Sequence, residues 1–184
     1  MLTIHRVLGI READGSEGST GDAVVVDGDR ISAVGTYEKL AAHAGQGART
    51  REWDGYLTPG RFEPDAVTLL QARYWPDPRE ADELGTGPLS GSALHDLDMT
   101  DTRWGASARR GVQRLLAHGT TAVAGPFTHP AVRVAVERSP VRILHAPRPN
   151  PLTPSAVADF AVFTEPEGEC LVTVIGGRLV FRRA

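Results

Sequence analysis

The stretch Asp22–Gly35, DAVVVDGDRISAVG, decides the fold of the first third of the chain. Two runs rich in β-branched residues flank the sequence Asp27-Gly28-Asp29. A tight turn between two strands needs positive φ angles, which glycine adopts at little cost, so Asp-Gly between such runs is a strong hairpin signal. We therefore predict strands at 23–26 and 30–35 that are joined by this turn.

The same β character recurs at both ends of the chain. Short apolar strands are expected at 2–8 and 50–53, with one or two helical turns at 37–43 between them. Toward the other end, a strand at 158–163 precedes a second hairpin, 171–181, whose turn is Gly176-Gly177. A single hairpin cannot bury a sheet face. Residues 1–57 and 158–184 are therefore predicted to form one small composite β-sandwich.

The middle of the chain changes to a helical period. Ala108, Val112 and Leu115 recur at the spacing of an amphipathic helix over 104–118, and Pro130 is placed to begin a second helix over 130–138. Apolar strands are expected at 57–62, 120–124 and 141–144. Alternating strands and helices indicate parallel strands, so the predicted fold class is mixed α/β, with residues 58–157 as a truncated β/α insert.

Residues 76–103 within that insert are polar and carry no clear period. A loop of this length is usually a lid, a binding loop or disordered. Trp75 and Trp104 flank it, and each could cover a pocket or simply belong to the core.

Composition excludes several classes of protein. The chain has 184 residues and a net charge of −3, which argues against a nucleic-acid binder that relies on a cationic surface. Its one cysteine excludes a disulfide framework and a multi-thiolate zinc site. It has neither a membrane-length apolar run nor a signal-peptide pattern, so we expect a cytoplasmic protein without membrane association. The scarcity of lysine is typical of a GC-rich bacterial genome.

The residues quoted so far resemble a known family. Asp22–Gly35, followed by Leu57-Thr58-Pro59-Gly60, is similar to the start of the amidohydrolase superfamily, which includes imidazolonepropionase and the aminofutalosine and chlorohydrolase-type deaminases. Ser107–Ala124 resembles the helix and second barrel strand of the deaminase branch, and 158–163 with 174–181 resembles the return to the sandwich. The resemblance implies a β-sandwich attached to a (β/α)₈ (TIM) barrel, with metal-dependent hydrolysis of C–N bonds.

The chain departs from the family where the metal would bind. After Pro-Gly the family carries an acid, one residue and then His-x-His, whereas this chain continues with Arg61-Phe62-Glu63-Pro64-Asp65-Ala66-Val67. Glu63 matches the acid, but Asp65 and Val67 stand at the two histidine positions, and valine cannot bind a metal. The insert also holds only about three of eight strands, since a full barrel needs roughly 250 residues. We therefore expect a partial TIM barrel with no metal and no other cofactor.

Polar side chains follow each predicted strand of the insert. Glu63 and Asp65 follow the first strand, Thr128 and His129 the second, and His145 the third. Ligands and catalytic groups gather at the carboxyl ends of parallel strands. Two carboxylates and two imidazoles could hold one metal ion or act as an acid–base pair, or they could be ordinary loop residues. Glu63, Asp65, His129 and His145 are the candidate catalytic residues, with no metal assigned to them.

Three functions remain open from the sequence. The preferred one is a degenerate amidohydrolase-like protein without metal-dependent activity, which binds a small molecule or serves as a partner or scaffold protein. The alternative is a metal-independent enzyme, a C–N hydrolase or lyase acting on a cyclic amide or nucleoside-like metabolite. The third is a hydrolase completed by another chain. Three strands leave a free sheet edge, so we also expect a homodimer, or a heteromer with a larger barrel protein, formed through the insert.

Overall fold

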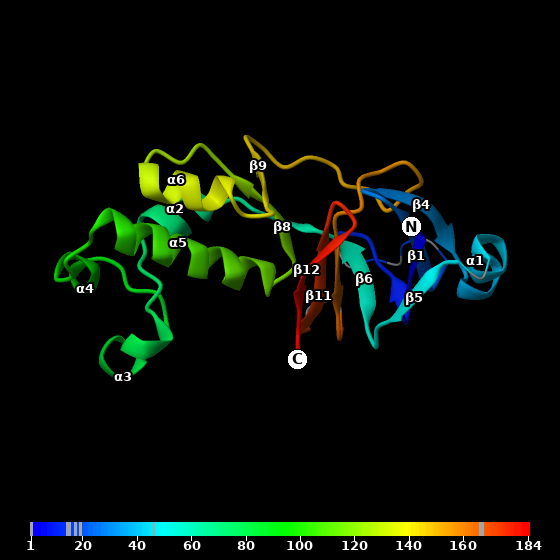
Figure 1. Ribbon diagram of the computed structural model, residues 1–184, viewed down its shortest axis with the longest axis horizontal. Helices are drawn as coiled ribbons and strands as arrows, with labels where there is room; N and C mark the ends of the chain where they lie inside the picture. Colours follow the sequence, from blue (N-terminus) through cyan, green and yellow to red (C-terminus); the bar gives the residue numbers. More distant parts are fainter. Residues whose placement is uncertain (1, 14–15, 17, 19, 46, 166–167) are drawn as a thin grey trace. The chain divides into compact units, whose positions relative to one another are not determined.

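The computed structural model describes residues 2–13, 16, 18, 20–45, 47–165 and 168–184 (Figure 1). The chain divides into two compact units. The first comprises residues 1–61, 116–121 and 148–184, and the second comprises residues 62–115 and 122–147. No helix among the described residues is both long and apolar enough to cross a membrane.

The first unit contains a four-stranded sheet in the order β4-β3-β1-β5. Its elements are β1 (Leu2–Arg6), β3 (Ala23–Asp27), β4 (Arg30–Gly35), β5 (Arg49–Glu52) and the helix α1 (Tyr37–Ala44) that precedes β5. The predicted Asp-Gly hairpin is confirmed, because β3 and β4 pair antiparallel up to Asp27 and Arg30 and Gly28 has a φ of 60°. β5 runs parallel to β1 and is one of the two edge strands of this sheet.

A five-stranded sheet in the order β12-β11-β10-β6-β2 completes this unit. Its strands are β2 (Gly9–Ile10), β6 (Tyr56–Pro59), β10 (Phe160–Phe163), β11 (Cys170–Ile175) and β12 (Arg178–Arg182). β6 pairs antiparallel with β10, with Leu57 opposite Val162, so strands from distant parts of the sequence share one sheet. The second predicted hairpin is confirmed, since β11 and β12 flank Gly176-Gly177.

The two sheets share one apolar core. Val24 and Ile31 contribute from the four-stranded sheet, and Leu57, Phe160 and Val172 contribute from the five-stranded sheet, all 1% exposed or less. Burial of each such side chain contributes about 1.5–3 kcal/mol relative to exposure. This shared core makes each sheet dependent on the other.

The second unit carries most of a three-stranded sheet in the order β7-β8-β9. Its elements are β7 (Arg61–Glu63), α2 (Ala66–Gln71), α5 (Asp101–Leu116), β8 (Thr120–Ala124), α6 (Pro130–Glu137) and β9 (Arg142–Leu144). β8 and β9 are parallel, as predicted. No other strand among the described residues joins this sheet, and the chain passes from β9 through residues 145–159 directly to β10. The described fold is mixed α/β without a closed barrel.

The predicted single strand at 57–62 is wrong, because it is two strands in different sheets. β6 ends at Pro59 and β7 begins at Arg61. A side chain at Gly60 would collide with the side chain of Thr121, so the residue between the two strands must be glycine for this approach. The contact joins residues far apart in the sequence, which is why local pattern does not reveal it.

Residues 76–103 are not a structureless loop. They contain a 3₁₀ turn η1 (Pro78–Glu80), α3 (Ala81–Leu84) and α4 (Ser92–His95). Tyr74 and Leu89 form an isolated antiparallel bridge, with N···O distances of 2.9 and 2.8 Å. Short helices and this bridge give the segment a defined course despite its polar composition.

Candidate functional site

The two carboxylates predicted at the first strand end lie at the start of α2. Glu63 is the last residue of β7, and its Oε1 accepts a hydrogen bond from the backbone N–H of Asp65 at 2.9 Å. Asp65 is exposed and immediately precedes Ala66, which is fully buried at the first position of α2. Val67 lies within the helix. The structure therefore brings Glu63 and Asp65 together, with the Glu63 carboxylate stabilising the turn into the helix.

His129 has a more enclosed environment. It precedes Pro130 of α6, and its backbone N–H donates to Gln71 Oε1 at 2.7 Å. Its ring lies 5.4 Å from that of Trp104, and its Nε2 lies 3.9 Å from Asp101 Oδ1. The Nδ1 atom is buried and has no hydrogen-bond partner among the described residues. An imidazole beside a carboxylate, with its other nitrogen free, has the composition of an acid–base pair.

His145 follows β9 and is exposed. Among the described residues, neither it nor His129 makes a hydrogen bond or ion pair with Glu63 or Asp65. No group of three or more histidine, cysteine or acidic side chains within the described part of the chain could hold a metal ion. The four candidate residues thus form a carboxylate pair and two separate imidazoles, and their shared catalytic role stays a prediction.

A pocket of about 400 Å³ in the second unit was not predicted from the sequence. Tyr74 is fully buried beside it, and its hydroxyl donates to Glu80 Oε2 at 2.5 Å. Arg103 donates from one terminal nitrogen to Glu80 Oε1 at 2.7 Å and from Nε to the Tyr74 hydroxyl at 3.3 Å. The only local signal was the spacing Asp77-Pro78-Arg79-Glu80, which forms a capping box around η1.

The hydrogen bonds among Tyr74, Glu80 and Arg103 change the pKa values of these side chains. The hydrogen bonds from the Tyr74 hydroxyl, the Asp77 backbone N–H and Arg103 lower the pKa of Glu80 to about 2. Burial, together with the bond to Glu80, raises the pKa of Tyr74. Arg110 is similarly engaged, donating to the Trp75 carbonyl at 2.7 Å. Glu80 and Asp77 are paired with Arg103 and Arg110, so these four charges are already compensated within the lining of the pocket.

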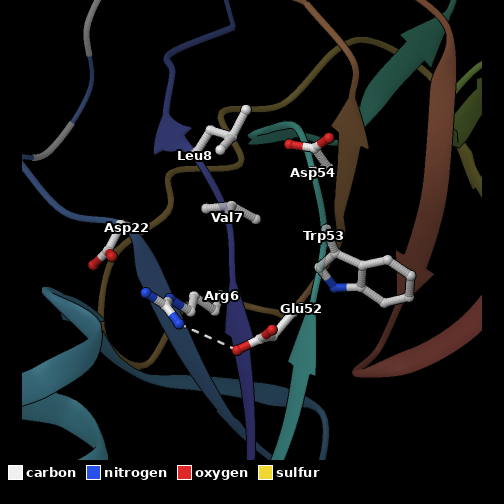
Figure 2. Close-up of a pocket in the computed structure, with 7 residues that line it drawn as sticks. All are labelled: Arg6, Val7, Leu8, Asp22, Glu52, Trp53 and Asp54. Atoms are coloured by element: carbon white, nitrogen blue, oxygen red, sulfur yellow. Dashed lines mark hydrogen bonds and ion pairs between the residues drawn. The ribbon is translucent and has the colours of Figure 1, made fainter.

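A larger pocket, of about 520 Å³, lies in the first unit (Figure 2). Across it, Arg6 and Glu52 form an ion pair at 3.2 Å. The Trp53 Nε1–H donates to Nδ1 of His5 at 3.1 Å. Burial, reinforced by the charge of Arg51, lowers the pKa of His5 to about 4. The His5 ring is therefore neutral at pH 7 and fixes the indole that forms one wall.

No protein-family model and no curated protein matches this chain. Solved structures match in part. A. niger ochratoxinase is 16% identical with a TM-score of 0.50, over 77% of this chain and 30% of that enzyme. An adenosine deaminase from Xanthomonas campestris with bound zinc is 18% identical with a TM-score of 0.51, over 77% and 33% of the two chains. An amidohydrolase from a Sargasso Sea sample is 19% identical with a TM-score of 0.47, over 78% and 33%.

The first two likenesses establish the fold. The chain shares part of its fold with the ochratoxinase and with the adenosine deaminase. It spans about a third of the length of these solved structures. The resemblance seen in the sequence is thus confirmed at the level of the fold.

The metal that the amidohydrolase fold implies does not fit the residues present at the end of β7. The resemblance places an acid and two histidines there, and this chain has Glu63, Asp65 and Val67. Valine offers no donor atom, and Glu63 already accepts a backbone hydrogen bond. The donor set at this strand end is therefore two carboxylates without an imidazole.

Proposed function

We propose that this amidohydrolase-like chain performs no metal-dependent hydrolysis and acts as a small-molecule-binding or partner protein. The end of β7 carries the proposal, because Asp65 and Val67 replace the histidine pair and the nearby carboxylate of Glu63 stabilises the entry to α2. A hydrolytic zinc site needs several nitrogen or oxygen ligands around one open position. The residues here do not supply that set.

The composite architecture supports a partner role. In this proposal, residues 1–57 and 158–184 form the sandwich domain, and residues 58–157 form a partial barrel. Among the described strands, the sheet β7-β8-β9 has two free edges. The unpaired backbone groups of a free edge can pair with another chain or be covered by it. The proposed partner is a second copy of the chain or a larger barrel protein, bound through this insert.

Metal analysis tests the central claim. Protein purified without added metal, and protein incubated with zinc and then desalted, should both hold far less than one zinc per chain. A double variant, Asp65→His with Val67→His, restores the histidine pair and serves as the matched comparison. About one tightly held transition metal per wild-type chain would overturn the proposal and direct mutagenesis to Asp65, His129 and His145.

A second candidate function rests on the His129–Asp101 pair, whose unpartnered Nδ1 suits a metal-independent acid–base role. A panel of cyclic amides and nucleosides tests it in metal-free buffer. His129→Gln should abolish any C–N hydrolysis or elimination found, whereas His145→Gln, at an exposed position, provides the comparison. Activity that survives His129→Gln would exclude this candidate.

A further inference from the structure

A second site in the first unit is built from three arginines and Trp53. Arg49 and Arg51 belong to β5, an edge strand of the four-stranded sheet, and Arg182 belongs to β12, an edge strand of the five-stranded sheet. Together with Glu52, Trp53 and Leu179 they line a pocket of about 230 Å³. This pocket shares no residue with the strand ends considered above.

The strand geometry explains why these side chains meet. Arg49 and Arg51 are two residues apart on β5, so they lie on the same face of that strand. In the five-stranded sheet, the register between β11 and β12 shifts, with Val174 opposite Leu179 and Val172 opposite Arg182. The extra residue in β12 puts Leu179 and Arg182 on the same face as the two core valines. The bulge thus turns Arg182 toward the pocket.

The three guanidinium groups lack carboxylate partners among the described residues. The one acid that lines the pocket, Glu52, is paired with Arg6 at 3.2 Å. Burial, and then the charges of Arg49 and Arg182, lower the pKa of Arg51. Like charges held together without a counter-ion destabilise a fold, and an anion bound among them would offset that repulsion. This differs from Arg103, whose guanidinium is paired with Glu80.

Trp53 gives the pocket a rigid wall. Its indole N–H is held by His5 Nδ1 at 3.1 Å, and the two rings stack at 19° with centroids 6.2 Å apart. The guanidinium carbon of Arg182 lies 5.6 Å from the centroid of the indole ring. The position of the ring is therefore set before any ligand arrives, which lowers the entropic cost of binding against it.

We propose that this pocket binds the phosphate group of a small phosphate ester. Guanidinium groups match the geometry of phosphate oxygens and can bind them in pairs. The volume is below the range of about 300–1,000 Å³ that holds a whole drug-sized ligand, so it suits a charged head group. The Trp53 side chain, which lines the pocket beside Arg182, would contact the planar or apolar group attached to the phosphate.

Titration calorimetry with inorganic phosphate and with phenyl phosphate, at low ionic strength, tests this proposal. We expect saturable binding of one ligand per chain, with phenyl phosphate binding more tightly than inorganic phosphate. Arg51→Gln and Arg182→Gln should each weaken binding about tenfold, as expected for loss of a charge-assisted hydrogen bond. Trp53→Leu should remove the preference for phenyl phosphate.

Arg178→Gln is the matched control, because it removes the same charge from the same strand at a position that does not line the pocket. Its affinity for phenyl phosphate should stay within twofold of wild type. Arg51→Lys keeps the positive charge and is the control for a folding defect caused by removing it. Thermal melting should show that every variant is folded. Equal weakening by Arg178→Gln, or no saturation, would mean that the arginines only protect exposed strand edges. Tighter binding of an oligonucleotide or of anionic vesicles than of phenyl phosphate would also overturn the proposal.

Discussion

His5 is a buried titratable side chain whose protonation state is set by its neighbours. It is 1% exposed, accepts a hydrogen bond from Trp53 and lies edge-on to Phe160, with ring centroids 5.0 Å apart. Since Nδ1 accepts, the proton of the neutral ring lies on Nε2. A charge on this ring would break the bond from Trp53 and would be placed in an apolar core.

The pH dependence of stability should report this burial. The pKa of His5 is about 4 in the folded chain and near 6.5 when unfolded. Between these values the unfolded chain binds more protons, so stability is complete above about pH 6.5 and falls as the pH drops toward 4. The loss amounts to about 3 kcal/mol.

Urea unfolding at pH 7 and pH 4.5 measures this loss. In His5→Gln, whose side-chain oxygen can still accept from Trp53, most of the difference between the two pH values should disappear. An unchanged pH dependence in that variant would show that another group is responsible.

Gly60 provides a second test at this scale. In Gly60→Ala, the new methyl group would collide with the side chain of Thr121, and the junction of β6 and β7 would have to move away from β8. We expect a loss of about 2–4 kcal/mol in the free energy of unfolding, in the range of other severe steric changes. Gly47→Ala is the control, because open space surrounds a methyl group at that position. Similar effects of the two substitutions would contradict the steric argument.

Among the elements, those set by local chemistry were predictable from the sequence. Both hairpins follow from their glycine turns, and α6 begins at Pro130 as expected. The split at Gly60, the helix α2 and the ordering of 76–103 depend on contacts between distant residues. The surroundings of the candidate residues were not predictable for the same reason, because strand ends indicate where His129 lies but not that its neighbours are Gln71 and Trp104.

The hydrogen bonds among Tyr74, Glu80 and Arg103 should stabilise the folded conformation of residues 76–103, and this stabilisation should depend on pH. The pKa of Glu80 is lowered to about 2, so its contribution is complete above about pH 4.5 and is lost as the pH falls toward 2. At pH 7, Glu80→Gln should cost about 2 kcal/mol and increase hydrogen exchange in 76–103.

Near pH 2 the stability difference between Glu80→Gln and wild type should vanish. Glu83→Gln, an exposed acid on α3, removes the same charge and should change exchange little. If Glu83→Gln increases exchange as much as Glu80→Gln does, net charge rather than the network holds the segment.

On the scale of the whole molecule, the three-stranded sheet β7-β8-β9 is the feature on which we base the proposed assembly. β9 is an edge strand, and Ile143 within it is 39% exposed. The central strand β8 is mostly buried, whereas Arg142 and Ile143 of β9 are exposed, and parallel sheets are normally covered on both faces. These properties are the basis for the proposed assembly through the insert.

Light scattering coupled to size exclusion should detect a homodimer, or a heteromer when the partner is present, at micromolar concentration. Ile143→Lys should convert the assembly to a monomer, because it places a charge on the proposed interface. Leu8→Lys, which changes an exposed leucine of the first unit, should leave the assembly intact. A 19.7 kDa monomer at all concentrations, with no partner recovered, would contradict this proposal.

The pairing of β6 with β10 also determines when the chain can finish folding. A ribosome makes β6 early, but its neighbour β10 emerges only after the whole intervening insert has been synthesised. Until then, the sheet that contains β3 faces only β2 and β6, because the other three strands of the opposing sheet, β10, β11 and β12, are not yet made. Pairings between distant residues also form slowly, since the long loop must be closed first. During translation the nascent chain therefore exposes apolar sheet surface, and such surface is prone to aggregation until β10 arrives.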